Sequence, residues 1–276
     1  MRSRHMGNHF LTFLLILMLA MLLFPIYWSF NSSISSTQVI LSKNPSFFPK
    51  KILLDAYVDI FERKSVFLWL FNTVFVSLGA TVLSLICSLL AGYSLSRFRT
   101  YGQQLMGFIL LLSRMIPGTL LIIPLYMVFS RMKLINSYQA LIIMNLEGIV
   151  PFATWMMKGF FDSIPKEIEE AAYIDGCNWF STFVRVTMPL TIPGIAAVTI
   201  YSLILCWNEF LYARTLAYNA SKWVFTVALA SSVGEHSVDW SKLMAGGILF
   251  ILPLVFFFVL LEPFLISGMT SGSVKG

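Results

Sequence analysis

Six long apolar runs restrict this chain to one class of fold more strongly than any other feature. Each run is long enough to cross roughly 30 Å of hydrocarbon as a helix of about 20 residues. Only 12% of the 276 residues are charged, against about 25% in a soluble domain. The sequence therefore predicts an all-α membrane protein with six transmembrane helices, at Phe10–Phe30, Leu68–Ser94, Leu105–Phe129, Tyr138–Phe161, Pro189–Leu211 and Leu243–Ile266.

The first apolar run follows Arg2 and Arg4, so a cleaved secretory signal is the alternative to a transmembrane helix. The apolar segment of a signal peptide spans about 7–15 residues, and this run is longer. The serine-rich segment at 32–36 is compatible with cleavage, but we expect a retained helix.

Charge and cysteine content exclude several kinds of partner. The net charge of +6 fits contact with anionic membrane lipid, and we expect no nucleic-acid partner. Cys87, Cys177 and Cys206 lack the spacing of a metal site, so no metal site is expected. Lysine and arginine divide nearly evenly between the two sides of a six-span arrangement, so the positive-inside rule does not fix the orientation.

A charged segment, Ser163–Gly176, separates the fourth and fifth apolar runs. Its pattern predicts a short helix with Ser163 or Ile164 as N-cap and Pro165 in the first turn. Gly176 is expected to end this helix in the left-handed conformation.

A second short helix is expected at 178–187, with Phe180, Phe183 and Val184 on one side and Pro189 after it. Exposed apolar residues on such a helix–glycine–helix unit need a cover. A docking site for a partner and an amphipathic hairpin on the membrane surface are equal alternatives on periodicity alone.

The chain contains no G-x-x-x-x-G-K-[ST] sequence, so it cannot cradle ATP phosphates in a P-loop. The H-E-x-x-H and G-x-S-x-G patterns are absent as well. We expect a chain that is not an enzyme and holds no cofactor of its own.

The segment between the fourth and fifth runs reads Glu170-Ala-Ala-Tyr-Ile-Asp175-Gly176, followed by Phe183, Pro189-Leu190 and Pro193-Gly194. This pattern resembles the EAA loop of ABC importer permeases, and in particular the smaller permease subunit of maltose-type carbohydrate importers. The resemblance extends over almost the whole chain, through Asn72-Thr73, Ala91–Arg99, Arg114–Pro117, Gly159–Pro165, Trp207–Phe210 and Gly268–Gly276.

The resemblance implies the type I ABC importer permease fold, with residues 1–276 as a single transmembrane domain and a cytoplasmic coupling-helix loop at 163–188. It also implies a multi-pass protein of a bacterial or archaeal plasma membrane, with both termini in the cytoplasm. In that family the loop contacts an ATPase, and the implied coupling residues here are Glu169, Glu170, Ala171, Ala172, Asp175, Gly176, Phe183 and Pro189.

The implied function is that of a non-catalytic permease subunit in an ATP-driven, binding-protein-dependent importer of a sugar or oligosaccharide. The implied partners are a homologous second permease, an ATPase dimer that binds ATP and Mg, and an extracytoplasmic solute-binding protein. Two departures from the family pattern affect the cytoplasmic edge of the sixth span. Glu262-Pro263 stands where a basic pair is common, and Ser267 stands where a basic residue is common.

Several polar residues fall within or near the apolar spans, where a charge is costly and is usually paired or lines water. Candidates for a hydrophilic translocation path are Arg114, Asn145, Glu147, Asn208 and Glu209. The alternative is a structural role, which we favour for Glu209 and for Glu262. Arg114 and Glu147 lie on neighbouring spans and are a candidate pair.

Three other functions remain open. An ion-coupled secondary transporter that uses Arg114, Glu147 and Glu209 as a relay would keep its uptake after ATP depletion. An ABC permease for a solute other than a sugar, such as a glycerophosphodiester, would need ATP. A purely structural or signalling subunit would show no flux.

Overall fold

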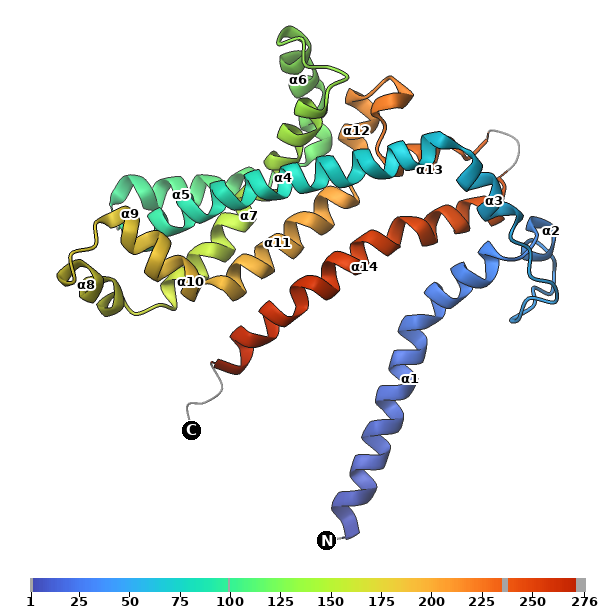
Figure 1. Cartoon of the computed structure of the whole chain (residues 1–276), viewed down its shortest axis with the longest axis horizontal. Helices are drawn as coiled ribbons and strands as arrows, with labels where there is room; N and C mark the ends of the chain where they lie inside the picture. The colour runs from blue at the N-terminus through green and yellow to red at the C-terminus, as the bar shows by residue number, and fades with distance from the viewer. Residues whose placement is uncertain (1, 99, 235–237, 272–276) are drawn as a thin grey trace. The chain divides into compact units, whose positions relative to one another are not determined.

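The computed structural model describes residues 2–98, 100–234 and 238–271, and every regular element within them is a helix (Figure 1). In order along the chain, the helices are α1 (Arg2–Ser33), α2 (Thr37–Ile40), α3 (Asp55–Glu62), α4 (Lys64–Arg97), α5 (Tyr101–Ser113), α6 (Gly118–Arg131), α7 (Tyr138–Asp162), α8 (Lys166–Ile174), α9 (Trp179–Thr182), α10 (Met188–Leu190), α11 (Ile192–Trp207), α12 (Leu211–Leu216), α13 (Phe225–Ser231) and α14 (Trp240–Ser271), with a π-helix at Phe183–Thr187 and a 3-10 helix at Ala220–Lys222.

The predicted spans correspond to two kinds of structure. Four of them are single helices of sufficient length and apolarity, namely α1, α4, α7 and α14. The third consists of α5 and α6, which meet at an angle of 103°. The fifth is α11, which follows a bend of 77° after the segment Trp179–Leu190. With each bent pair taken as one span, the described residues contain up to six.

Pro117 accounts for the break in the third span. Proline has no N–H and disfavours the helical conformation in the residue before it, which is Ile116. Pro117 itself is the N-cap residue of α6, with an extended backbone at φ −60° and ψ 128°. The continuous apolar run at 105–129 therefore folds as two helices joined by a turn at 114–117. Figure 1 shows α6 leaving the direction of α5 at this turn.

Contacts divide the chain into two compact units, Met1–Phe67 with Leu229–Leu252 and Leu68–Ala228 with Pro253–Gly276. In the first unit, the most apolar stretch of α1 contains no buried residue, as suits a helix covered by hydrocarbon. Polar contacts organise the other end of this unit. Thr37 Oγ1 donates to Asp239 Oδ1 at 2.9 Å, and Lys242 Nζ lies 2.5 Å from Asp59 Oδ2.

The second unit is built on the close packing of α4 with α7 and α11. A stripe of small residues on α4, Ala80, Ser84, Ser88 and Gly92, is buried. Ser84 Oγ donates to Ser202 Oγ of α11 at 3.1 Å. A Cβ atom added at Gly92 would lie 3.0 Å from the Thr154 carbonyl of α7. The small residues thus let the helices approach inside one chain, as membrane helices require.

Asn72 and Thr73, near the start of α4, hold the segment between α12 and α13. Asn72 Nδ2 donates to the carbonyls of Ser221 and Trp223 at 3.0 and 2.8 Å, and Tyr138 Oη donates to Asn72 Oδ1 at 2.7 Å. Thr73 Oγ1 accepts a hydrogen bond from the Phe225 N–H at 2.8 Å. The Asn72-Thr73 pair of the family pattern therefore has a structural role. The buried Asn72 amide binds loop carbonyls that are not paired within a helix.

The two departures in the sixth span fall in α14. Glu262 is exposed and follows the most apolar part of that helix. The side chain of Ser267 and residues 272–276 of the matched C-terminal segment lie outside the described residues.

Candidate functional site

The loop between α7 and α11 contains the charged segment that the sequence singles out. Its first helix, α8, begins after Pro165, which is the N-cap residue with an extended backbone at φ −56° and ψ 136°. The prediction of Ser163 or Ile164 as the N-cap was wrong. Ser163 instead ends α7, where its Oγ donates to the Phe160 carbonyl at 2.6 Å, and Pro165 then restricts the entry to the next helix.

The end of α8 agrees with the sequence prediction. Gly176 has φ +87°, in the left-handed region that glycine enters without steric cost. The Gly176 N–H donates to the Tyr173 carbonyl at 3.1 Å, and the Cys177 N–H donates to the Ala172 carbonyl at 3.0 Å. These bonds satisfy carbonyls at the C-terminal end of the helix and turn the chain back.

The second helix predicted at 178–187 is also present, but it changes type along its length. Asn178 Oδ1 caps α9 by accepting a hydrogen bond from the Ser181 N–H at 2.8 Å. From Phe183 to Thr187 the helix widens to a π-helix. Pro189 follows and has no N–H with which to close an ordinary turn onto the Arg185 carbonyl.

A buried ion pair joins α8 to the end of α4. Arg97 Nε lies 2.8 Å from Glu169 Oε1, and the two side chains are 8% and 7% exposed. Thr187 Oγ1 donates to Glu169 Oε1 at 2.9 Å, and Tyr93 Oη donates to Glu169 Oε2 at 3.2 Å. We call these four residues the Arg97–Glu169 network. Glu169 is stable in this position because charged and hydroxyl donors replace the water that it loses.

Aromatic rings support this network from the apolar side. Tyr93 of α4, Phe161 of α7 and Phe183 of the π-helix are all buried. The ring of Tyr93 lies 5.4 Å from that of Phe161 and 4.7 Å from that of Phe183. Such pairs add to the burial of area itself, so the loop is fixed to α4 and α7 rather than slack.

The predicted coupling residues divide between two faces of the loop. Glu169, Ala172 and Phe183 are buried within the chain, so they support the loop and are not on its surface. The exposed members are Glu170, Ala171, Asp175, Gly176 and Pro189.

Two further exposed residues were not among the predicted coupling residues. Ile174 is 87% exposed and Phe180 is 63% exposed. Ile174 lies four residues after Glu170 and three after Ala171, and therefore shares their helix face. This periodicity would have found Ile174 once Glu169 and Ala172 were assigned to the buried face. We call six of the exposed residues the outer surface of the loop: Glu170, Ala171, Ile174, Asp175, Gly176 and Phe180.

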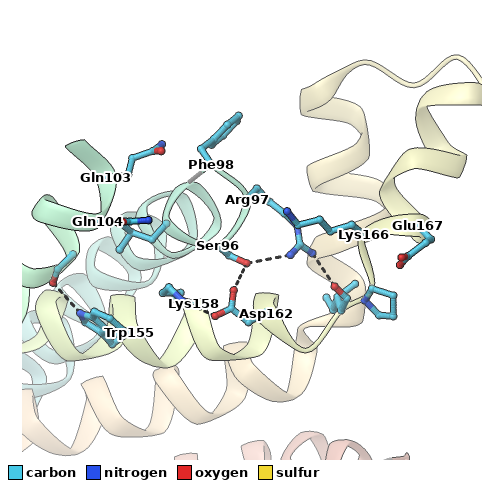
Figure 2. Close-up of a pocket in the computed structure, with 14 residues that line it drawn as sticks. Ser96, Arg97, Phe98, Gln103, Gln104, Trp155, Lys158, Asp162, Lys166 and Glu167 are labelled. Carbon is cyan, nitrogen blue, oxygen red and sulfur yellow. Dashed lines mark hydrogen bonds and ion pairs between the residues drawn. The ribbon is translucent and has the colours of Figure 1, made fainter. Parts of the chain in front are cut away.

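A cavity of about 840 Å³ lies beside the loop, between the end of α4, the start of α5 and the end of α7 (Figure 2). Three of its lining charges, Arg97, Lys158 and Asp162, are in ion pairs. Asp162 accepts a hydrogen bond from Ser96 Oγ at 2.7 Å and lies 2.5 Å from Lys158 Nζ. Trp155 Nε1 donates to the Gly107 carbonyl at 3.1 Å. Figure 2 shows Arg97 at the edge of this cavity, directed toward the turn between α7 and α8.

The candidate path residues gather around the turn between α5 and α6. Arg114 caps the end of α5 and is exposed, and its Nη1 lies close to Gly148 of α7. Glu147 accepts a hydrogen bond from Tyr212 Oη at 3.1 Å. The salt bridges among the described residues do not include Arg114 with Glu147. The same Tyr212 hydroxyl lies against Gly118, where an added Cβ would clash with it.

The remaining candidates have backbone partners. Glu209 accepts hydrogen bonds from the Tyr212 and Ala213 N–H groups at 2.6 and 2.9 Å, and so begins α12. This is why the fifth helix ends at Trp207 and not at Leu211. Asn145 and Asn208 each donate to the carbonyl four residues earlier in their own helix, at 2.8 Å. Asn208 is exposed and Asn145 is buried.

Within the described residues no group of three or more histidine, cysteine, aspartate or glutamate side chains could hold a metal ion. The cysteines Cys87, Cys177 and Cys206 are free thiols. The exposed surface of the loop combines acidic and apolar side chains, and the Arg97–Glu169 network supports it from behind.

Comparison with known proteins identifies the family. Residues 81–270 match the family described as binding-protein-dependent transport system inner membrane component. The chain is 33% identical over 264 residues to the inner membrane ABC transporter permease protein YcjP of Escherichia coli K12, covering 95% of this chain and 94% of that protein. It is 32% identical over 257 residues to the diacetylchitobiose uptake system permease protein DasC of Streptomyces coelicolor, covering 92% of each.

A solved structure has the same fold. The crystal structure of a bacterial ABC transporter involved in the import of the acidic polysaccharide alginate contains a chain that superposes with a TM-score of 0.80 at 24% identity, covering 95% of this chain and 98% of that one. The predicted permease fold is thereby confirmed. The membrane-spanning helices and the loop between α7 and α11 agree with these matches. The chain belongs to the family of binding-protein-dependent transport system inner membrane components.

Proposed function

We propose that this chain is one permease subunit of an ATP-driven importer for a sugar or oligosaccharide. Its family consists of permease components that work with a binding protein, and its relative DasC serves the uptake of diacetylchitobiose. A homologous second permease, an ATPase dimer that binds ATP and Mg, and an extracytoplasmic solute-binding protein complete the transporter.

The observation that carries this proposal is the outer surface of the loop between α7 and α11. It presents Ile174, which is 87% exposed, and the acidic side chain of Glu170. The buried Arg97–Glu169 ion pair attaches the opposite face of the same helix to α4. An exposed apolar residue on a rigid, charged element suits a protein partner, and the ATPase is that partner. The loop and both termini then lie in the cytoplasm.

The turn at 114–117, between α5 and α6, supports a translocation path that runs beside this turn. Backbone groups outside a helix are tolerated at membrane depth only where they are buried in protein or line a water-filled cavity. Met115 is 76% exposed at this turn, so the described residues leave its side chain largely uncovered. Arg114, Glu147 and Tyr212 surround it, and in the complete transporter they face the path together with the second permease. Discontinuous helices of this kind mark binding sites in other transporters.

The first test is ATP dependence. The complete transporter is reconstituted in vesicles and supplied with its solute-binding protein. It is expected to take up oligosaccharide only while ATP is hydrolysed. Uptake that survives ATP depletion and collapses with the ion gradient would instead establish the secondary-transporter alternative. Co-purification of a P-loop ATPase with this chain tests the partner assignment directly.

The outer surface gives the next prediction. Ile174→Asp removes an exposed apolar side chain without touching the core, so we expect normal membrane insertion. ATPase binding should fall by about tenfold or more, since such a side chain contributes about 1.5–3 kcal/mol when a partner buries it.

Gly176→Ala should act more mildly, because a side chain at φ +87° strains the turn by about 1–2 kcal/mol. Glu170→Gln should also uncouple ATP hydrolysis from uptake.

The control for these variants is Arg131→Ala, which removes an exposed charge in the last turn of α6, outside the loop between α7 and α11. It is expected to retain uptake within about twofold, as surface substitutions usually do. For each variant we would measure the ATPase retained in pull-down experiments and the uptake per ATP hydrolysed. Full retention by Ile174→Asp would exclude this surface as the ATPase contact.

The path gives a separate prediction. Tyr212→Phe removes the hydrogen bond to Glu147 and should reduce uptake by roughly tenfold, a loss in the range of a hydrogen bond to a charged group, while ATPase binding stays normal. Glu262→Gln, a charge change at the far end of α14, is the matched control and should leave uptake unchanged. Equal effects of the two variants would contradict a path at the α5–α6 turn.

A further inference from the structure

Arg97 is placed to hold three segments of the second unit together. Its Nε contacts Glu169 of α8 at 2.8 Å. Its Nη1 donates to the Phe161 carbonyl at the end of α7 at 2.9 Å, and its Nη2 donates to the Ile164 carbonyl in the following turn at 3.3 Å. Because the guanidinium is planar and rigid, these bonds fix the end of α4, the end of α7 and α8 in one geometry.

Glu169 makes the same connection from the other side. It accepts hydrogen bonds from Arg97 of α4 and from Thr187, which ends the π-helix on the return arm of the loop. A third bond comes from Tyr93, one turn before Arg97. Both arms of the loop are therefore tied to the last turn of α4 through a single buried carboxylate.

Among the residues that the structure describes, the side chains of the outer surface have no comparable attachment. Glu170 and Ile174 face away from the chain, so a displacement applied to them reaches the bundle through the inner face of α8. On that face Glu169 is the charged residue; its partners Arg97 and Tyr93 lie on α4, and its partner Thr187 lies on the π-helix. A rigid buried pair transmits such a displacement, whereas a flexible exposed pair does not.

We infer that Arg97 is a positioning residue for coupling: through Glu169 it makes α8 and the cytoplasmic end of α4 move as one body when the ATPase moves the loop. This inference rests on the proposed function, because it assumes that a partner acts on the outer surface. It assigns the transmission to a contact within this chain, separate from the surface that the partner touches.

The test uses the complete reconstituted transporter and the double variant Arg97→Gln/Glu169→Gln. The double variant removes both charges together, so no unpaired charge remains in the interior. We expect it to assemble and to hydrolyse ATP, while uptake per ATP falls by about tenfold, within the range found for coupling between sites. Lys158→Gln is the matched control, because its ion pair with Asp162 lies within one helix, and it should keep uptake per ATP at the wild-type value.

A second measurement does not depend on a destabilising variant. Spin labels at Leu90→Cys on α4 and Glu167→Cys on α8, both exposed positions, are placed in a protein whose native cysteines have been replaced. The distance between the labels should stay constant through the ATP cycle in the otherwise native chain. In the Arg97→Gln/Glu169→Gln background it should change or broaden.

Wild-type uptake per ATP in the assembled double variant would overturn the inference, and so would a label distance that changes through the cycle of the native chain. Failure of the proposed function has a different signature. In that case the unaltered transporter would not couple uptake to ATP at all, or Ile174→Asp would have no effect on ATPase binding.

Discussion

Phe161→Ala is expected to lower the free energy of unfolding by about 3–5 kcal/mol, the cost of emptying a fully buried phenylalanine site. Phe161 is completely buried, and its ring packs against Tyr93 and, more distantly, Phe183. Its loss leaves a cavity under the loop between α7 and α11, and the fixed helix ends limit how far the neighbours can fill it. Denaturant titration of the purified chain in detergent micelles measures the change.

Phe180→Ala is the control for this prediction. Phe180 belongs to the same loop and has the same chemistry, but its ring is 63% exposed. Its truncation should change the free energy of unfolding by less than about 0.5 kcal/mol. Equal losses for the two variants would show that the loop does not pack on α4 and α7 as described.

Arg97→Gln alone is expected to destabilise the chain by about 3–5 kcal/mol, because it leaves the buried carboxylate of Glu169 without its charged partner. Glutamine is also too short to reach the carbonyls of Phe161 and Ile164 together, so these acceptors lose their donors. Thermal denaturation and denaturant titration in the same micelles measure the loss.

The double variant Arg97→Gln/Glu169→Gln should recover a large part of that stability, because neutral partners remove the penalty of an unpaired buried charge. Together with Glu169→Gln, the three variants form a double-mutant cycle, and for residues in direct contact we expect an interaction energy of about 0.5–3 kcal/mol. An interaction energy near zero would mean that Arg97 and Glu169 act independently, in conflict with their 2.8 Å contact.

The helices were predictable because their signal is local. A run of about 20 apolar residues can satisfy its backbone in hydrocarbon only as a helix, and four of the predicted spans are single helices in the structure. Gly176 was predictable for the same reason, since its left-handed conformation is determined by the neighbouring turn. Pro117 is visible in the sequence as well, but a count of apolar residues does not show that the span bends by 103° there.

The division of the loop into an inner and an outer face was less accessible. Glu169 and Glu170 are adjacent and chemically alike, and the sequence pattern assigned both to coupling. Glu169 is buried and Glu170 is exposed, because only the first points toward the guanidinium of Arg97. Which of two neighbouring carboxylates faces inward depends on the rotation of α8 about its axis, and that rotation is decided by a residue far away in the sequence.

The sequence by itself determined the class of protein, the number of apolar spans, the position of the charged loop and the glycine that ends its first helix, because each depends on residues close together in the chain. The tertiary structure alone decided that Arg97 and Glu169 form a buried pair, and with it which side of α8 is buried and that Ile174 stands on the exposed side. Both features depend on packing between α4, α7 and α8, whose contacts join residues many turns apart in the sequence.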